Sequence, residues 1–426
     1  MSEVADQTGA KVVRKRRVFY IPGYDPIHPR RYRELYRKEG AAQAEISGYQ
    51  IDLKPKTGEG AYGWHVDAQI DGATTQAQVD VLVWSDIVRG SMSNSIPATY
   101  LQLVRTAATY IGTGALFRLM RLRKGPIIAA LYPIGMLLAQ LLTAFGLGRI
   151  AANLLEWGAE RLLRMSFGPL LSGQYLWMAE LAGWALTAAI VAFVLRWFKA
   201  KDCKFFAYYL MHDFAYSARW MGANPPPLEA RMTEFADTIA EALLQESDEV
   251  LVVGHSSGAH LAVSILADLI RAGKVPETGP KLAFLSLGHV VPMVSFLPKA
   301  NRLRGDLHFL STRDEVTWVD VTAPGDGCAF ALCDPVSVSV DAPKAKRWPL
   351  VFSAAFTQSL SPARWKELRW RFFRLHFQYL CAFDRPKDYD YFQITAGPQT
   401  LRERYADRPQ SRSRIDVLAS GYTDIT

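Results

Sequence analysis

A serine between glycines is the pattern with the clearest chemistry in this sequence. Gly254-His255-Ser256-Ser257-Gly258 follows the apolar run Val250–Val253 and precedes a helical pattern that ends near Gly273. Strand, Gly-x-Ser-x-Gly and helix is the context of a nucleophile elbow. The turn is so tight that Cβ atoms two residues from Ser256 would clash, which explains both glycines, and we expect strained backbone angles at Ser256. The pattern predicts a nucleophilic hydroxyl at the end of a buried parallel strand.

The simpler alternative is a glycine-rich connection that carries a helix-capping serine. The nucleophile hypothesis requires a base, an acid and donors for an oxyanion elsewhere in the chain. One donor is the backbone N–H of Ser257, because it lies at the N-terminus of the predicted helix, where N–H groups can meet a developing negative charge.

A second loop extends the pattern. The predicted strand Val18–Ile21 ends in Pro22-Gly23-Tyr24, ahead of a predicted helix over residues 29–42. Together with Gly254-x-Ser256-x-Gly258, this loop resembles the α/β-hydrolase superfamily of serine esterases and lipases over residues 17–100 and 205–400. The resemblance implies the order serine, acid, histidine and a second oxyanion donor in this loop, for which we assign the N–H of Tyr24. The loop departs from the family in lacking the common His-Gly.

Four histidines follow the serine, and the family order selects the last. His376 comes after the last plausible sheet strand, among the aromatic residues 373–379. His260 falls on the elbow helix, His289 at the end of the next strand, and His308 inside a predicted strand. We predict that His376 takes the proton of Ser256 and returns it to the leaving group; the alternative is a packed core histidine.

Two aspartates compete for the role of the acid. Asp314 directly follows the predicted strand 306–311, whereas Asp326 lies in a tight loop, Ala323-Pro324-Gly325-Asp326-Gly327, after the apolar pair Trp318-Val319. We rank Asp326 first and Asp314 close behind, since in membrane-associated relatives we expect a tryptophan, a loop and then the acid. The acid would orient His376 without taking its proton. An Asp that only stabilises a turn is the alternative for both.

Alternating strands and helices must position these residues. Period-two runs over residues 49–53, 62–68 and 79–84, with Asp71-Gly72 between two of them, predict antiparallel edge strands leading into a central strand. Two further core strands are predicted over 281–288 and 306–311. The pattern predicts the α/β class, with a doubly wound, mainly parallel sheet interrupted by a membrane hairpin.

Two apolar segments interrupt the soluble pattern within residues 101–204. Residues 125–148 contain no charged side chain, and a second apolar segment covers 175–195. Both are long enough to cross a bilayer core of about 30 Å, so we predict transmembrane helices at about 126–147 and 175–197. The alternative is a hydrophobic cap over the active site of a soluble or peripheral lipase.

Positive charge is concentrated outside the two apolar segments. Four cations precede the first segment and four follow the second: Arg118, Arg121, Arg123, Lys124, Arg196, Lys199, Lys201 and Lys204. By the positive-inside rule, both flanks and the hydrolase domain lie in the cytoplasm. We therefore predict an integral protein of the cytoplasmic (inner) membrane.

Composition restricts the partners and cofactors. The net charge of +8 suggests an anionic partner, and without a nucleic-acid-binding motif a membrane surface is favoured over nucleic acid. The four cysteines show no CxxC spacing, so we expect neither a metal nor a disulfide framework. No cofactor is predicted, and the sequence does not indicate an oligomeric state.

Three peripheral segments complete the predicted organisation. Residues 1–16 form a disordered basic tail and residues 401–426 a polar, flexible C-terminal tail. Between them, residues 365–375 show an apolar helix face surrounded by Arg364, Lys366, Arg369, Arg371 and Arg374. We expect a helix that packs on the sheet, with contact to lipid headgroups as the alternative.

The sequence thus predicts a membrane-anchored serine hydrolase that cleaves a carboxylic ester, a lipid or acyl ester, through an acyl-enzyme on Ser256. Two alternatives remain at this point: a catalytically silent membrane scaffold with a hydrolase fold, and an acyltransferase that uses the same serine.

Overall fold

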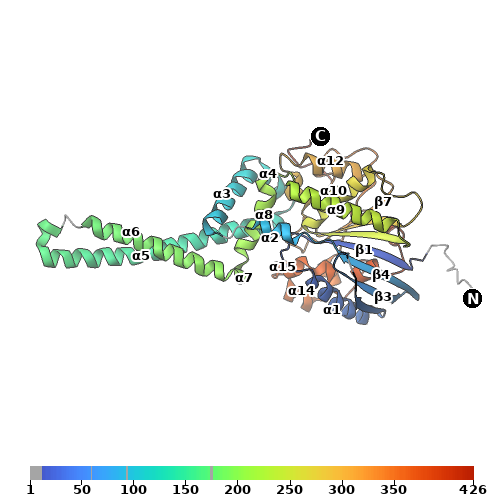
Figure 1. Ribbon diagram of the computed structural model, residues 1–426, viewed down its shortest axis with the longest axis horizontal. Helices are drawn as coiled ribbons and strands as arrows, with labels where there is room; N and C mark the ends of the chain where they lie inside the picture. Colours follow the sequence, from blue (N-terminus) through green and yellow to red (C-terminus); the bar gives the residue numbers. More distant parts are fainter. Residues whose placement is uncertain (1–11, 59, 93–94, 173–175) are drawn as a thin grey trace, which may run out of the picture. The chain divides into compact units, whose positions relative to one another are not determined.

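An eight-stranded sheet organises the larger of two compact units (Figure 1). The structure, a computed structural model, describes residues 12–58, 60–92, 95–172 and 176–426. The sheet unit comprises Met1–Ser91, Ala108–Ile128 and Ser217–Thr426, and the second unit Met92–Ala107 and Ala129–Tyr216. Residues 1–11 of the predicted tail and residue 175, where the second predicted span begins, lie outside the described residues.

The sheet is mixed and mostly parallel, which confirms the predicted α/β class. Its order is β2-β3-β4-β1-β5-β6-β7-β8. The pairs β2–β3 and β3–β4 are antiparallel and all the others are parallel. The strands are β1 Lys15–Ile21, β2 Gln50–Pro55, β3 Gly63–Ile70, β4 Ala73–Val81, β5 Glu249–His255, β6 Lys281–Leu287, β7 Val316–Thr322 and β8 Leu350–Ser353.

Local sequence signals explain the centre and the edge of this sheet. All seven residues of β5 are buried, as expected for a β-branched run covered on both faces. At the edge, β3 turns into β4 through Asp71 (φ 52°) and Gly72 (φ 75°). Two positive φ angles in succession are what a two-residue hairpin of type I′ requires. The predicted hairpin is confirmed.

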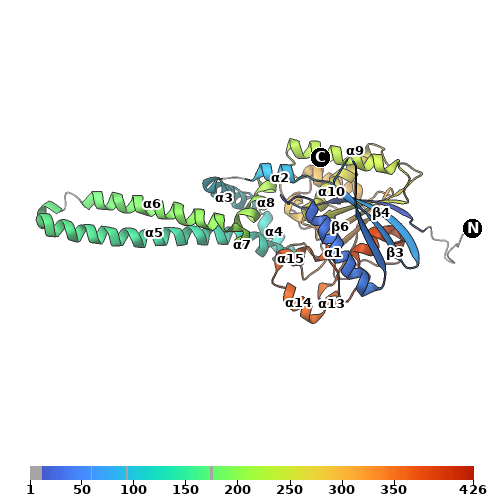
Figure 2. The same cartoon turned by 60° about the horizontal axis from the view of Figure 1, so that its bottom comes forward.

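Helices cover both faces of the sheet (Figures 1 and 2). On one face α10 (Ser257–Arg271) packs on β1, β5 and β6, with α9 (Pro226–Leu243) and α12 (Asn301–Leu310) beside it. Side chains of α1 (Arg30–Ser47) and of the C-terminal helices form the core on the other face. The short C-terminal elements are α13 Phe356–Ser359, α14 Pro362–Leu368, α15 Phe372–His376, η1 Gln378–Leu380, α16 Tyr391–Ala396 and α17 Leu401–Arg404; α11, Val291–Ser295, lies between β6 and α12.

The predicted strand over residues 306–311 is wrong, because these residues belong to α12 and its C-terminal end. Leu303, Leu307 and Leu310 are all buried. Their spacing of four and three residues is helical, and a window that begins at residue 306 misses it. The true strand after β6 is β7, which contains Trp318. Asp314 therefore precedes a strand, and Asp326 follows one.

The basic run near the N-terminus is part of the sheet rather than of a disordered tail. Arg16 lies on β1 with a fully buried side chain, and its Nε is 2.7 Å from Oε2 of Glu249 on β5. Its Nη1 donates to the carbonyl of Gly397 (2.7 Å), while Oε1 of Glu249 accepts the N–H of Leu401 (2.6 Å). This ion pair joins two central strands to the C-terminal segment.

The C-terminal segment is likewise packed, so the predicted flexible tail over 401–426 is wrong. Ile415 forms a bridge with Cys333, and its N–H donates to the carbonyl of Leu332 at 2.7 Å. The N–H of Ser411 donates to the carbonyl of Val351 on β8 at 2.9 Å. Backbone pairing orders this polar stretch, and backbone pairing leaves no pattern of apolar side chains to read.

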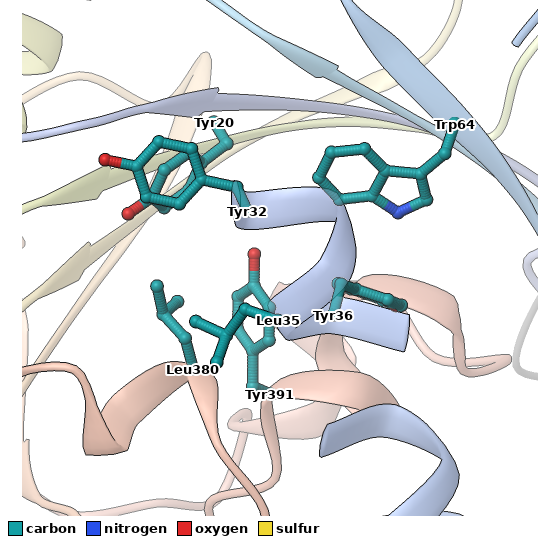
Figure 3. A pocket seen from close by; sticks show the side chains of 7 residues that line it. All are labelled: Tyr20, Tyr32, Leu35, Tyr36, Trp64, Leu380 and Tyr391. Carbon is teal, nitrogen blue, oxygen red and sulfur yellow. The ribbon is translucent and has the colours of Figure 1, made fainter. Parts of the chain in front are cut away.

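The aromatic core between α1 and the sheet encloses a small cavity (Figure 3). Its lining comprises Tyr20, Tyr32, Leu35, Tyr36, Trp64, Leu380 and Tyr391. Its volume of about 10 Å³ is at the lower limit of what one water molecule needs and is too small for an organic substrate. A second hollow of about 410 Å³ is lined by polar residues around Asp388 and Arg404. Ser256, Asp326 and His376 line neither.

The remaining helices lie between β4 and α9 in the chain. They are α2 Ser85–Ser91, α3 Ile96–Gly112, α4 Ala115–Leu122, α5 Lys124–Ser172, α6 Leu176–Ala200, α7 Asp202–Phe205 and α8 Ala207–Arg219. In the second unit, Leu137 of α5 packs with Leu103 of α3 and Met211 of α8. The predicted apolar segments thus occur as helices within α5 and α6.

Helices α5 and α6 form an antiparallel pair in the second unit (Figure 1). Gly148 of α5 lies against Thr187 of α6, and Gly183 of α6 lies against Glu156 of α5. The glycines allow close approach, as small residues do between membrane helices. The helix continues well past residue 147 before its backbone kinks at Gly168 (φ 72°, ψ 170°). Helix α6 therefore also packs beside residues 148–156, farther along than the predicted span 126–147.

Both helices are long and apolar enough to cross a membrane. The 25 residues of α6 correspond to a length of about 37 Å, compared with about 30 Å for a bilayer core. Only 28% of the apolar window in α5 and 17% of that in α6 are buried. Large apolar side chains such as Leu142 and Phe193 are each 71% exposed.

The buried Arg16–Glu249 pair predicts unequal effects of two neighbouring substitutions. Arg16→Met should lower the free energy of unfolding by about 3–5 kcal/mol, because it leaves Glu249 buried without its cation. Lys15→Met, which removes an exposed pair with Glu246, should cost at most about 1 kcal/mol. Urea unfolding, followed by tryptophan fluorescence, measures both free energies. Equal shifts of the two midpoints would contradict a structural role for the buried pair.

Candidate active site

Ser256 occupies a strained turn between β5 and α10. Its φ of 58° and ψ of −122° lie outside the regions that a non-glycine residue normally adopts. A Cβ at Gly254 would come within 2.8 Å of the carbonyl oxygen of Gly258, and a Cβ at Gly258 would collide with the carbonyl of Ile21 on β1. The expected strain and the steric need for both glycines are confirmed.

Backbone contacts hold this turn over the ends of the neighbouring strands. The N–H of Ser256 donates to the carbonyl of Leu287 at the end of β6 (2.9 Å). On the other side, a Cβ at Gly23 would lie 3.0 Å from Cβ and 3.3 Å from Oγ of Ser256. The loop after β1 therefore lies against Ser256, and a side chain at residue 23 would crowd the serine.

Side chains fasten the loop that carries Tyr24. The indole Nε1 of Trp84 donates to the carbonyl of Pro22 (2.9 Å), and the hydroxyl of Tyr24 is 2.6 Å from Oγ of Ser91. Asp25 accepts the N–H of Ile27 (2.9 Å) and the hydroxyl of Tyr32. These contacts fix the loop next to Ser256. In the chain, the predicted donor Tyr24 follows Gly23, and the predicted donor Ser257 follows Ser256. Ser257 begins α10, so its N–H has no acceptor within that helix.

Asp326 and His376 meet in a buried ion-pair geometry. Nδ1 of His376 is 2.7 Å from Oδ2 of Asp326, and both residues are at least nine-tenths buried. Asp326 lies in the loop after β7, and His376 is the last residue of α15. Of the two candidate acids the structure brings this one to the histidine. Asp314 is exposed and pairs with Arg347 instead.

Three donors keep Asp326 ionised. Besides His376, the hydroxyl of Tyr379 donates to Oδ2 (3.0 Å), and the N–H of Cys328 donates to Oδ1 (2.9 Å). Burial raises the pKa of Asp326, but His376 and these hydrogen bonds outweigh burial and hold the pKa below its usual value. A carboxylate with a depressed pKa is charged at neutral pH, as an acid that orients and stabilises an imidazolium must be.

His255, beside the serine, supports the backbone of the candidate base. Its Nε2 is 3.0 Å from the carbonyl oxygen of His376, and the two rings lie 4.8 Å apart. Because a carbonyl only accepts, Nε2 of His255 must carry a proton. The pKa of His255 is lowered to about 3, mainly because the ring is buried and to a lesser degree because His376 lies nearby. His255 is therefore a neutral donor that positions the backbone of His376.

Ser256 and His376 are not yet hydrogen-bonded to each other in this structure. Within the described residues, Oγ of Ser256 and His376 form no hydrogen bond. Both nevertheless border the end of β6: Ser256 bonds Leu287, and a Cβ at Gly288 would lie 3.2 Å from Cε1 of His376. Catalytic hydrogen bonds are often long before substrate binds and tighten in the complex.

The other histidines after the serine take different places. His289 is fully buried, and its Nε2 is 3.0 Å from the carbonyl of Cys333. Burial lowers the pKa values of His260 and His289 to about 4. His308 lies on α12 rather than on a strand. Only His376, among these four, contacts a carboxylate of the site through a hydrogen bond.

Three side chains of the site have the chemistry of metal ligands. Potential ligand atoms of Asp326, Cys328 and His376 lie within 4.8 Å of one another. Two of these residues already share a hydrogen bond, so an ion bound by all three would compete with the Asp326–His376 contact.

Tyr379 and His255 are the supporting residues that the sequence does not reveal. Tyr379 follows the candidate base by three residues, but an aromatic stretch gives no sign that its hydroxyl reaches Asp326. His255 stands inside the glycine-serine motif at one of its variable positions. In both residues a polar atom is aimed at the site while the rest of the ring packs in the core, and the core role hides the polar one.

Alanine substitutions of three glycines should show where the serine turn requires the absence of a side chain. Gly258→Ala should lower stability by about 1–3 kcal/mol or more, because the new methyl group meets backbone of β1 that cannot move freely. Gly90→Ala is the control, since a Cβ there meets nothing within 4 Å. Gly23→Ala should fold but displace Ser256. Thermal unfolding measures the first two, and a Gly258→Ala protein as stable as the control would refute the packing argument.

Comparisons with known proteins find no match to this chain among family models, curated proteins or solved structures.

Proposed function

We propose that this protein is a membrane-anchored serine hydrolase with an α/β-hydrolase fold, which cleaves a carboxylic ester through an acyl-enzyme on Ser256. The observation that carries the proposal is the buried hydrogen bond between Asp326 and His376, located at the same strand ends as the positive-φ turn of Ser256. A buried ionised carboxylate on a histidine next to a strained serine suits nucleophilic catalysis.

The proposed reaction assigns one task to each group. Oγ of Ser256 attacks the carbonyl carbon of the ester while its proton passes to His376, and Asp326 stabilises the resulting imidazolium. The N–H groups of Tyr24 and Ser257 donate to the oxyanion. Collapse of the tetrahedral intermediate breaks the ester C–O bond, and His376 protonates the departing alcohol. Water, activated by His376, then attacks the acyl-enzyme and releases the carboxylic acid and free Ser256.

The order of the parts along the chain supports the family assignment. The serine follows the fifth strand, the acid follows the seventh, and the histidine comes last, which agrees with the order serine, acid, histidine in α/β-hydrolases. The mostly parallel sheet places the ends of β5, β6 and β7 next to one another. Loops at the carboxyl ends of adjacent parallel strands are where such sheets bind ligands.

The α5–α6 pair supports the membrane anchor. Its apolar side chains remain largely exposed, and transferring them into lipid removes the cost of holding them in water. The two cationic flanks, Arg118–Lys124 and Arg196–Lys204, favour a cytoplasmic position for the sheet unit. We propose a cytoplasmic-membrane location and a lipid or acyl ester as substrate. An acyltransferase would differ only in using an alcohol in place of water.

Fluorophosphonate labelling tests the enzyme proposal. The wild-type protein in membranes should form a covalent adduct that stays in the membrane pellet after an alkaline wash. Ser256→Ala should abolish the adduct and His376→Ala should reduce it strongly, because the nucleophile and its base are lost. Ser413→Ala and His308→Ala, on a surface turn and on α12, should label like the wild type. A folded wild-type protein without an adduct would favour the silent scaffold.

Asparagine substitutions should identify the acid. Asp326→Asn should lower the rate of ester hydrolysis by about 10⁴-fold, because the amide no longer supports the correct form of His376. Asp314→Asn should leave the rate unchanged, since Asp314 is exposed and pairs with Arg347. Hydrolysis of a soluble chromogenic ester measures both. The opposite ranking would show that Asp326 is only a structural turn residue.

A further inference from the structure

The segment between Ser361 and His376 carries exposed aromatic and cationic side chains next to the candidate site. The sequence predicts one helix here, but the structure has two, α14 and α15, separated by residues 369–371. We name as the basic lip the group Arg364, Lys366, Arg369, Trp370, Arg371, Phe372 and Arg374.

The basic lip is anchored in the core but presents its aromatic residues to the outside. Leu368 and Leu375 are at most 1% exposed and fasten both helices to the sheet. Between them Trp370 is 72% and Phe372 47% exposed. Exposing two large aromatic side chains so close together is unfavourable in water unless a partner covers them.

Charge on the basic lip is strongly positive. Its five cations face a single acid, Glu367, which leaves a net charge of +4 from five positive and one negative side chains over residues 361–376. Glu367 binds Arg371 and Arg374 through Oε1 at 3.4 and 3.2 Å, so it gathers arginines rather than neutralising the surface. Arg369 lies over the ring of Trp370, 5.6 Å from its centroid.

The basic lip borders the loop of the candidate acid. The ring of Phe372 lies 3.2 Å from a Cβ built at Gly327, and the ring of Trp365 lies 2.7 Å from one built at Gly325. Both glycines flank Asp326. A Cβ built at Gly125, in the first turn of α5, would lie 3.3 Å from Cα of Gly327. The loop of Asp326 thus has the basic lip as one neighbour and the beginning of the apolar helix α5 as another.

We propose that the basic lip binds an anionic phospholipid surface. Aromatic rings next to arginines are typical of segments that lie in the headgroup region, and a cationic segment is attracted to an anionic leaflet. The continuation of α5 into an apolar stretch favours lipid over an acidic protein as the occupant. The inference rests on the membrane anchor of the proposed function, and it deepens that function: the candidate site would face the headgroups of the leaflet that supplies its ester.

Hydrogen–deuterium exchange on the full-length protein tests the proposal. The protein is inserted in nanodiscs of phosphatidylcholine, with and without phosphatidylglycerol, and the exchange of residues 362–377 is followed. We expect slower exchange in the anionic discs only. Trp370→Ser combined with Arg369→Glu should lose this protection, because the pair removes one exposed ring and reverses one charge while leaving the arginines on Glu367 in place.

Arg412→Glu combined with Val417→Ser is the matched control. It reverses one exposed charge and removes one exposed apolar side chain at another place in the same unit, and it should keep the protection. Peptides from β5 report in each sample whether the sheet is folded. Equal exchange in both kinds of disc, or loss of protection in the control as well, would overturn the proposal.

Two further measurements distinguish lipid binding from an acidic protein partner and from the serine chemistry. Polyglutamate that protects the segment in neutral discs as strongly as phosphatidylglycerol does would reassign the basic lip to an acidic protein partner and overturn lipid binding. Fluorophosphonate labelling of the same samples distinguishes the two proposals. Labelling without lipid protection overturns the basic lip alone, whereas lipid protection without labelling supports the basic lip and contradicts the serine chemistry.

Discussion

The tight turn at Ser256 is the constraint on which the rest of the sheet unit depends. β5 is buried along its whole length, so the chain must pass from the strand into α10 without room for side chains next to the turn. Gly258 rests against the backbone of Ile21, and the N–H of Ser256 bonds Leu287. The ends of β1, β5 and β6 are therefore locked together at one point. The cost of the positive φ at Ser256 is offset by contacts that leave the turn no alternative.

This lock also brings together loops that are distant in sequence. The loop of Tyr24 follows β1, and Gly288 follows β6 and lies against Tyr379 and His376. Two histidines at this point have opposite electrostatic surroundings. His255 is buried next to a carbonyl and stays neutral, while Nδ1 of His376 meets a carboxylate that can stabilise its charged form. The same side chain thus serves once as a fixed donor and once as a candidate base.

The sequence predicts what depends on neighbours along the chain. The glycines around Ser256, the Asp71-Gly72 hairpin and the apolar run of β5 all follow from local sterics and burial. Prediction from the sequence fails where the interaction partner of a residue is distant along the chain. The role of Arg16 is set by Glu249, more than two hundred residues later, and nothing near Arg16 distinguishes it from the exposed Lys15. Residues 306–311 are wrongly predicted as a strand because the helical spacing of the buried Leu303, Leu307 and Leu310 begins before residue 306.

The wrongly predicted strand at 306–311 also affects the choice between Asp314 and Asp326 as the acid. With a strand at 306–311, Asp314 occupies a strand end and competes with Asp326; with β7 in its true place, Asp314 lies before the strand, at the opposite edge of the sheet. Tyr379 remains beyond sequence reasoning, because only the folded chain shows that its hydroxyl points at Oδ2 of Asp326. A local sequence pattern can indicate Asp326 as a candidate acid, but the hydrogen bonds that keep it ionised are visible only in the folded structure.

Strand order explains why an insertion between β4 and β5 suits a site at Ser256. β4, β1 and β5 are adjacent and parallel, so the chain leaves β4 at the edge of the sheet where β5 ends in the serine turn. The first helix after β4 is already attached to that edge, since Ser91 bonds the hydroxyl of Tyr24. An insertion after β3 would leave the sheet at the opposite edge, because β3 runs antiparallel to β4. The chain therefore leaves the sheet for the inserted helices at the same edge that carries the serine turn, and this follows from strand direction alone.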